Sequence, residues 1–155
     1  MNYLRQFQYN EEVIGRFIDV LNDHPDSPEK VKSLLSHLLN ALEIWVSRVQ
    51  DREAEVGVWE QHAPERLHEL NRRCHDTIFR LLETGNLKKV HAYQNSSGNA
   101  FKNSLDEILT HLIIHSAHHR AQIASCWSEA GIEPPSGDFI FWARERGKQK
   151  GPSFR

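Results

Sequence analysis

The stretch SLDEILTHLIIHSAHHRAQIASCWSEAG, residues 104–131, predicts the longest helix of the chain. Ser104 followed three residues later by Glu107 is the pattern of a capping box, in which the two residues satisfy amide groups at the start of a helix. Gly131 ends the helix, and two prolines that follow soon after prevent it from continuing. Apolar residues occupy most of its circumference, so we expect this helix to be buried inside a bundle.

Apolar residues at three- and four-residue spacing predict three earlier helices. The first covers residues 2–22, and the second runs from Pro28 to residue 50 with Ser27 as its N-cap. The third begins at Pro64 and is closed by Gly85. Four helices of this length indicate an all-α fold, a four-helix bundle that forms one domain over the whole chain.

Residues 88–104, between the third and fourth helices, change character. The segment KVHAYQ alternates between apolar and polar residues, NSSGN is typical of a turn, and AFKNS follows, which predicts a short β-hairpin before the last long helix. After that helix, DFIFWARER at residues 138–146 predicts one or two further helical turns. We expect the basic tail GKQKGPSFR, residues 147–155, to be frayed.

Composition and charge exclude several classes of protein. The chain has 155 residues, is 39% hydrophobic and carries a formal net charge of -2, so we expect a globular protein with neither a nucleic-acid nor a membrane partner. No apolar run could span a bilayer and the first residues lack the pattern of a secretory signal, so we expect a cytoplasmic location. Cys74 and Cys126 form no CxxC motif, and we expect both to pack as small apolar residues.

Histidine is in excess, with ten residues in the chain. On the predicted fourth helix, His111, His115, His118, His119 and Gln122 lie within one arc of about 100°. Histidines at positions i and i+4 can direct ring nitrogens at one divalent ion, so this stripe predicts a metal site. A serine follows His115 where helical zinc proteases of the HExxH type carry a glutamate, which excludes that class.

A third ligand must come from another element of the fold. His37 is the strongest candidate because it lies in the middle of the second helix, flanked by Leu34 and Leu38 of the apolar stripe. The remaining histidines lie in loops, in the hairpin or on a helix with charged neighbours, and we interpret them as surface residues: His24, His62, His68, His75 and His91.

Two segments carry a resemblance to a known family: SHLLNALEIW, residues 36–45, and HLIIHSAHHRAQI, residues 111–123. With them the chain resembles the DinB-like superfamily of four-helix-bundle metalloproteins, which includes the YfiT-like thiol-S-transferases and related thiol-dependent isomerases. The resemblance covers essentially the whole chain, including the hairpin and PPSGDFIFWAR at residues 134–144. It implies a long crossover connection between the second and third helices, and a homodimer.

The resemblance also implies a set of metal ligands. In the family, a histidine of the second helix and both histidines of an HxxxH pair bind a divalent metal, which corresponds here to His37, His115 and His119. The family pattern NHxTxHRGQ aligns with residues 114–122, where an isoleucine and two alanines replace its asparagine, threonine and glycine. All three ligands are retained.

The first functional hypothesis is a metal-dependent enzyme acting on a small molecule. Three neutral imidazoles leave open coordination positions, where an ion can activate a low-molecular-weight thiol or water for attack on a small electrophile. We expect zinc or nickel, with iron, manganese or cobalt as alternatives. His111, within reach of Glu107, and His118 are candidates for hydrogen-bonding neighbours or a proton relay, and Gln122 for a substrate or water contact. We expect Arg120 in a salt bridge or an interface.

The second hypothesis is a non-catalytic, stress-associated bundle. The histidines would then be structural or hold a metal that rigidifies the fold without turnover, and the exposed surface would serve dimerisation. A metal that adds stability but supports neither thiol transfer nor hydrolysis would distinguish this hypothesis from the first.

Overall fold

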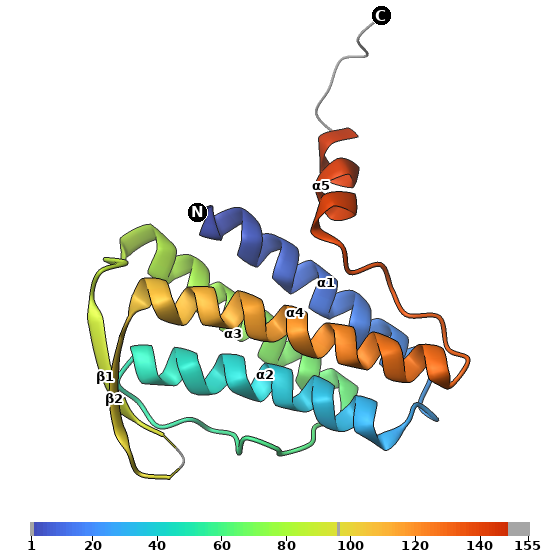
Figure 1. Ribbon diagram of the computed structural model, residues 1–155, viewed down its shortest axis with the longest axis horizontal. Coiled ribbons are helices and arrows are strands. Elements are labelled where there is room, and N and C mark those ends of the chain that lie inside the picture. The colour runs from blue at the N-terminus through green and yellow to red at the C-terminus, as the bar shows by residue number, and fades with distance from the viewer. Residues whose placement is uncertain (1, 96, 149–155) are drawn as a thin grey trace, which may run out of the picture.

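The computed structural model describes residues 2–95 and 97–148. Within this part of the chain, four long helices form a bundle, a two-stranded antiparallel hairpin precedes the last of them, and a shorter helix follows (Figure 1). The elements are α1 (Tyr3–Asp23), α2 (Glu29–Val49), α3 (Pro64–Thr84), β1 (Val90–Gln94), β2 (Ala100–Ser104), α4 (Leu105–Glu129) and α5 (Phe139–Lys148). The prediction of an all-α four-helix bundle with a short hairpin is confirmed.

The connection between α2 and α3 sets the topology of the bundle. α1 and α4 run in one direction and α2 and α3 in the other, so residues 50–63, the crossover segment, pass along the bundle from the end of α2 to the start of α3 (Figure 1). α1 packs mainly on α3, and α2 packs on both α4 and α3. This is the long crossover that the family resemblance implies, and it lays an irregular segment against α2.

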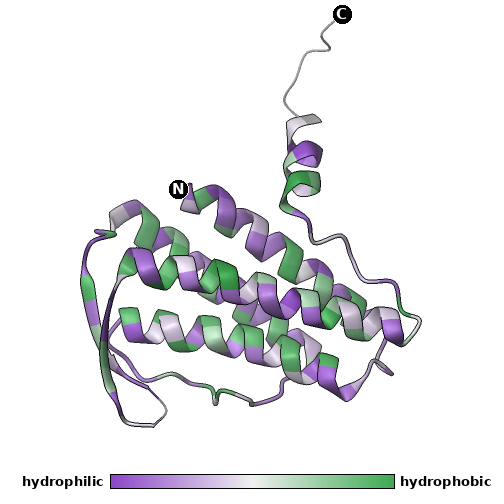
Figure 2. Ribbon diagram, viewed as in Figure 1, coloured by the Kyte–Doolittle hydropathy of each residue, from purple (hydrophilic) through white to green (hydrophobic). Residues whose placement is uncertain are grey.

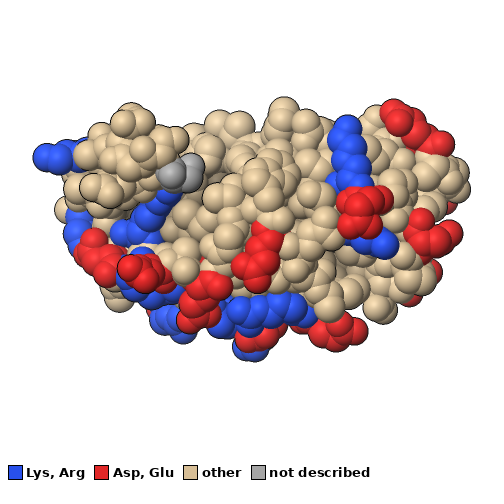
Figure 3. All heavy atoms as spheres, turned by 90° about the horizontal axis from the view of Figure 1, so that it is seen from below, with Lys and Arg blue, Asp and Glu red and all other residues tan. Residues whose placement is uncertain are grey.

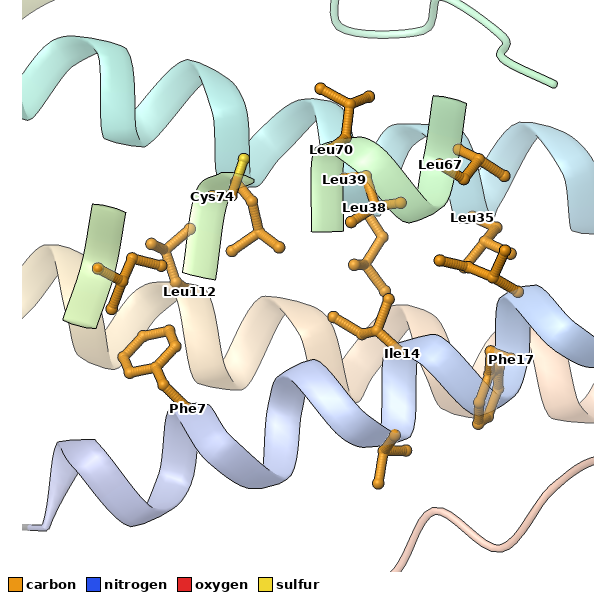
Figure 4. Close-up of a cluster of buried hydrophobic side chains, with 14 of the residues drawn as sticks. Phe7, Ile14, Phe17, Leu35, Leu38, Leu39, Leu67, Leu70, Cys74 and Leu112 are labelled. Carbon is orange, nitrogen blue, oxygen red and sulfur yellow. The ribbon is translucent and has the colours of Figure 1, made fainter. Parts of the chain in front are cut away.

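The core lies between the four long helices and is built from the apolar stripe of each one. Hydrophobic and hydrophilic residues alternate around the helices (Figure 2), as expected for amphipathic helices that bury one face. As predicted, Cys74 is buried in the core and Cys126 packs partly buried against it. Figure 4 shows a part of the core in which the labelled side chains are at most 2% exposed: Phe7, Ile14, Phe17, Leu35, Leu38, Leu39, Leu67, Leu70, Cys74 and Leu112.

The start of α2 differs from the prediction. Pro28, with an extended backbone at φ -50° and ψ 140°, is the N-cap residue, so Ser27 lies one position too early to cap the helix. The Ser27 hydroxyl instead donates to the carbonyl oxygen of His24 at 2.7 Å and accepts the Nε1–H of Trp127 at 2.9 Å. Ser27 therefore satisfies the buried indole of α4 rather than the first amides of α2.

The start of α4 agrees with the prediction, whereas the helix after α4 differs from it in length. The capping box at the start of α4 is present, because the Ser104 hydroxyl accepts the Glu107 amide at 3.2 Å and the Glu107 carboxylate accepts the Ser104 amide at 2.8 Å. The helix predicted after α4 is longer than one or two turns, since α5 spans ten residues. Of the tail predicted to be frayed, residues 149–155 lie outside the described residues.

α4 is not buried on all sides, contrary to the prediction. Its buried residues form one face, while Ile114 on the outer side is 63% exposed. The reason is that α4 packs mainly on α2, with a smaller contact to α1, so its outer side stays open to solvent. Two of the residues on the buried face, Ser116 and Arg120, are polar.

These two residues belong to a buried polar cluster between α1, α3 and α4. Arg120 donates to Asn10 Oδ1 at 2.6 Å and to the Tyr9 hydroxyl at 2.9 Å. The Asn10 amide group donates in turn to His75 Nε2 at 3.2 Å and to the Ser116 hydroxyl at 3.4 Å. The prediction of a salt bridge for Arg120 is therefore wrong, because its partners are neutral. The surface position predicted for His75 is also wrong, because His75 is fully buried in this cluster.

The other histidines predicted to lie at the surface divide into two pairs. His24 and His68 are exposed, as predicted. His62 is not, because the crossover segment packs back on α2 and lets the His62 ring donate to Asn40 Oδ1 at 2.7 Å. His91 is buried because it occupies the side of β1 that faces the bundle. The sequence places His62 in a loop and His91 in a hairpin, and neither position indicates that the segment packs against the bundle.

Charges of both signs are interspersed on the face of the molecule shown in Figure 3. Exposed apolar side chains occur side by side on α5, at Phe139, Ile140 and Phe141. Among residues 2–95 and 97–148, none of the helices combines the length and the apolar character that crossing a bilayer requires.

Candidate metal centre

Three histidines from two helices meet on one side of the bundle. His37 lies in the middle of α2, and His115 and His119 lie one turn apart on α4. One ring nitrogen from each of the three lies within 4.8 Å of those of the other two. Because α2 packs directly on α4, His37 faces the pair across the helix interface. The structure thus brings together the three residues that the sequence indicated as metal ligands.

The spacing of the ring nitrogens fits a shared ion. The Nε2 atoms of His115 and His119 lie 3.1 Å apart. Two nitrogens that bind one zinc ion at about 2.0–2.1 Å with a tetrahedral angle lie about 3.3 Å apart, so little movement is needed to place an ion between them. The His37 ring centroid lies 5.3 Å from that of His115 and 4.8 Å from that of His119.

The crossover segment orients His37. The Nδ1 atom of His37 lies 3.0 Å from the carbonyl oxygen of Val58, which can only accept a hydrogen bond. Nδ1 therefore carries the proton of the neutral ring, and Nε2 keeps the lone pair that a metal needs. The indole of Trp59 stacks on the same ring, with 3.9 Å between centroids and 12° between planes. A backbone carbonyl and an aromatic face together fix this imidazole.

Gln122 orients His119 in the same way from within α4. The Gln122 Oε1 atom accepts the Nδ1–H of His119 at 2.8 Å, which leaves Nε2 of His119 directed at His115. The sequence predicted a substrate or water contact for Gln122. In the structure its amide oxygen contacts a candidate ligand, and the substrate or water contact stays a prediction.

The two remaining histidines of the stripe flank this group without joining it. The His111 ring lies 5.3 Å from that of His115 and packs edge-on against Trp45 at 5.4 Å, measured between centroids. The expected hydrogen bond from His111 to Glu107 does not form, because the Glu107 carboxylate is taken up by the cap of α4. His118 is exposed, with its ring 5.1 Å from that of His119.

The surroundings of the two α4 imidazoles, His115 and His119, keep both rings neutral. Burial, reinforced by the neighbouring histidines, lowers the pKa of His115 to about 3. Burial also lowers the pKa of His119: it outweighs the hydrogen bond to Gln122, which raises the pKa, and His37 and His118 lower the pKa further. Since a metal binds the deprotonated nitrogen of imidazole, both rings are in their ligand form at neutral pH without having to lose a proton first.

The donor set points to an open site. Within the described residues the group contains three imidazoles and neither a thiolate nor a carboxylate. Structural zinc sites are closed by four protein ligands, whereas three protein ligands leave a position for water or substrate. The arrangement can therefore hold a divalent ion and expose it to a small molecule.

One group of the site, the Val58 carbonyl, could not be predicted from the sequence. It acts through the backbone, so no residue type at that position could have revealed it. Trp59 beside it is 58% exposed, and a large exposed aromatic residue in a loop is the only signal that the sequence offered for this part of the site.

The chain was compared with models of known protein families and with curated proteins. A model described as the DinB family matches residues 4–150, which include all three histidines, the crossover segment and the hairpin. No curated protein matches the chain.

Proposed function

The chain belongs to the DinB family, and from this premise we propose that it is a divalent-metal-dependent enzyme with a three-histidine site. In this proposal His37, His115 and His119 hold zinc or nickel. The substrates are a low-molecular-weight thiol or water and a small electrophile. When bound, a divalent ion with open positions supplies Lewis acidity, which lowers the pKa of a thiol or water and polarises a carbonyl.

One observation carries the proposal: the rings of His37 and His119 are each fixed by a hydrogen bond from Nδ1, which leaves Nε2 free for an ion. The Val58 carbonyl holds the Nδ1–H of His37, and Gln122 holds that of His119. If these histidines served only for packing, there would be no need for fixed tautomers that leave Nε2 without a proton. Such outer hydrogen bonds are typical of functional metal sites, where they set the tautomer and raise the basicity of the ligand.

The surroundings of the site suit a small, partly apolar substrate. Trp59 on one side and His111 with Trp45 on the other provide aromatic surface beside the three ligands. His111 can accept or donate a proton near His115, because burial and the nearby Arg48 lower its pKa and keep its ring neutral. His118 offers a second, exposed imidazole next to His119. These residues would position the substrate and move its proton.

The test is an activity measurement on protein purified without a metal-binding tag. The protein is analysed for metal, stripped with a chelator, and reloaded with zinc or nickel. Each form is assayed for consumption of a low-molecular-weight thiol with an epoxide and for hydrolysis of an activated ester. We expect activity only in the loaded forms, loss of activity in His119→Ala, and unchanged activity in His24→Ala, an exposed histidine in another part of the chain. Activity that survives complete removal of metal would contradict the proposal.

A second candidate function is a metal-stabilised bundle without turnover. It is favoured by the fact that the three histidines come from both α2 and α4, so that an ion would link two helices of the bundle. In that case a chelator lowers the melting temperature of the protein, but no member of the substrate panel is consumed by any loaded form. Turnover by the zinc or nickel form excludes this candidate.

A further inference from the structure

Arg120 is a buried cation without a counter-charge. The residue is 4% exposed, and its two hydrogen-bond acceptors, Asn10 Oδ1 and the Tyr9 hydroxyl, are both uncharged. In the part of the chain that the structure describes, its guanidinium forms no ion pair with a carboxylate, and both of these hydrogen bonds come from its terminal nitrogens, Nη1 and Nη2. Burying a guanidinium without a counter-charge is unfavourable, and a bound anion would offset that cost.

A cavity of about 330 Å³ opens beside this guanidinium. Arg120, Tyr9 and Asp138 supply polar side chains to its lining, and the apolar lining includes Phe17 and Ala124. The Tyr9 hydroxyl donates to the carbonyl oxygen of Gly137, so the loop before α5 is tied to the lining of the cavity. Pockets for small ligands combine this size with apolar walls and a few converging polar groups.

The cavity is separate from the metal centre. On α4, Ala121 and Ala124 point roughly opposite to His115 and His119 around the helix axis, at about 100° per residue. None of the three candidate metal ligands lines the cavity. A ligand bound here would therefore not touch the ion.

We propose that this cavity is a second binding site, for a small organic carboxylate. The carboxylate accepts hydrogen bonds from Arg120, whose planar guanidinium suits a carboxylate better than a single point charge does. The hydrocarbon part of the ligand lies against Phe17 and the small residues Ala121 and Ala124 of α4. Asp138, an exposed residue, also lines the cavity, so a ligand with more than one negative charge is disfavoured.

The test uses NMR of the zinc-loaded protein, in which the Arg120 Nε–H resonance is observed during titration with butyrate. Butyramide, which has nearly the same shape and no charge, is the matched probe. We expect a saturable shift with butyrate, with a Kd in the millimolar range, and none with butyramide at the same concentrations. The shift is expected to persist in His37→Ala, which separates this site from carboxylate binding at the metal.

Two variants complete the test. Arg120→Lys is expected to weaken butyrate binding at least about tenfold, and exposed Arg144→Lys to leave it unchanged. Because Arg120→Lys disturbs the buried cluster and can unfold the protein, Ala124→Leu provides a second route: it fills the cavity and leaves the guanidinium in place. We expect Ala124→Leu to abolish the shift. A response to butyramide equal to that to butyrate, the absence of saturation, or full binding by Ala124→Leu would overturn the proposal.

Discussion

The imidazole of His37 is held by the backbone carbonyl of Val58, at 3.0 Å from Nδ1 to oxygen. The contact joins a helical ligand to an irregular segment that belongs to no helix or strand. The same segment is fixed to α2 by Asn40, whose amide group donates to the Glu60 carbonyl at 2.7 Å and whose oxygen accepts from His62. The crossover that sets the bundle topology is therefore also a part of the candidate metal centre.

Removing single ligands is expected to lower metal affinity without unfolding the bundle. His119→Ala leaves one histidine on α4, so the purified protein should contain well under one equivalent of metal. His37→Ala keeps the α4 pair and is expected to bind at least about a hundredfold more weakly than the wild type. Elemental analysis and circular dichroism on the same samples provide the measurement. Full metal occupancy in His119→Ala would show that the assignment is wrong.

Gln122 allows a sharper test, because it touches a candidate ligand without being one. Gln122→Leu removes the acceptor for the Nδ1–H of His119 and is expected to weaken metal affinity about 10- to 100-fold. Gln122→Glu keeps an acceptor at the same place and is the matched control, expected to bind at least as tightly as the wild type. Competition with a chromogenic chelator measures both. Equal affinities of the Leu and Glu variants would mean that the hydrogen bond has no role in binding.

The lowered pKa of His75 is expected to make the stability of the protein depend on pH. Burial lowers its pKa from the ordinary 6.5 to about 4 in the folded protein. Below pH 6.5 the unfolded chain takes up a proton that the folded protein does not, so stability is lost as pH falls from 6.5 towards 4. Between about pH 7 and pH 5, this residue alone is expected to cost about 2 kcal/mol of unfolding free energy.

The measurement is urea unfolding of the wild type and of His75→Phe at both pH values, with metal removed by a chelator in each case. The variant lacks the titrating group, so its unfolding free energy should fall by about 2 kcal/mol less than that of the wild type over this interval. Parallel losses in the two proteins would assign the pH dependence to other residues.

The capping box of α4 is expected to make a measurable contribution to stability. Ser104→Ala removes the side chain that accepts the Glu107 amide and should lower the unfolding free energy by about 1 kcal/mol. Ser125→Ala, on the exposed surface of the same helix, is the control and should change it by less than about 0.5 kcal/mol. Urea denaturation with unchanged slope measures both. An effect of Ser104→Ala no larger than that of the control would exclude a capping role.

Sequence periodicity was enough to predict the four long helices, because each has a regular apolar stripe and recognisable end signals. The histidine stripe of α4 was equally readable, since its residues are local and helix geometry places them on one face. His37 could be selected by its position on α2 together with the family resemblance. The parts of the site that follow from one helix, or from a pair of packed helices, were therefore accessible from the sequence.

Arg120 and His75 show where this reasoning failed. Both are polar residues on helices, and nothing local distinguishes them from solvated ones. Both can be buried because each forms a hydrogen bond with the side chain of Asn10 on α1, which lies far from them in the chain. Polar burial of this kind depends on three helices packing at once, so the sequence of any one of them does not reveal it.

The placement of the ligands on helices far apart in the chain limits the order in which the metal centre can assemble during folding. His115 and His119 are neighbours as soon as α4 forms, whereas His37 and the Val58 carbonyl reach them only after α2, α4 and residues 50–63 have come together. Long-range contacts of this kind form late, because a large loop must close first. An ion added during refolding would therefore meet a two-histidine helix before it meets the complete site. Its change from weak to tight binding would mark the moment at which the bundle closes.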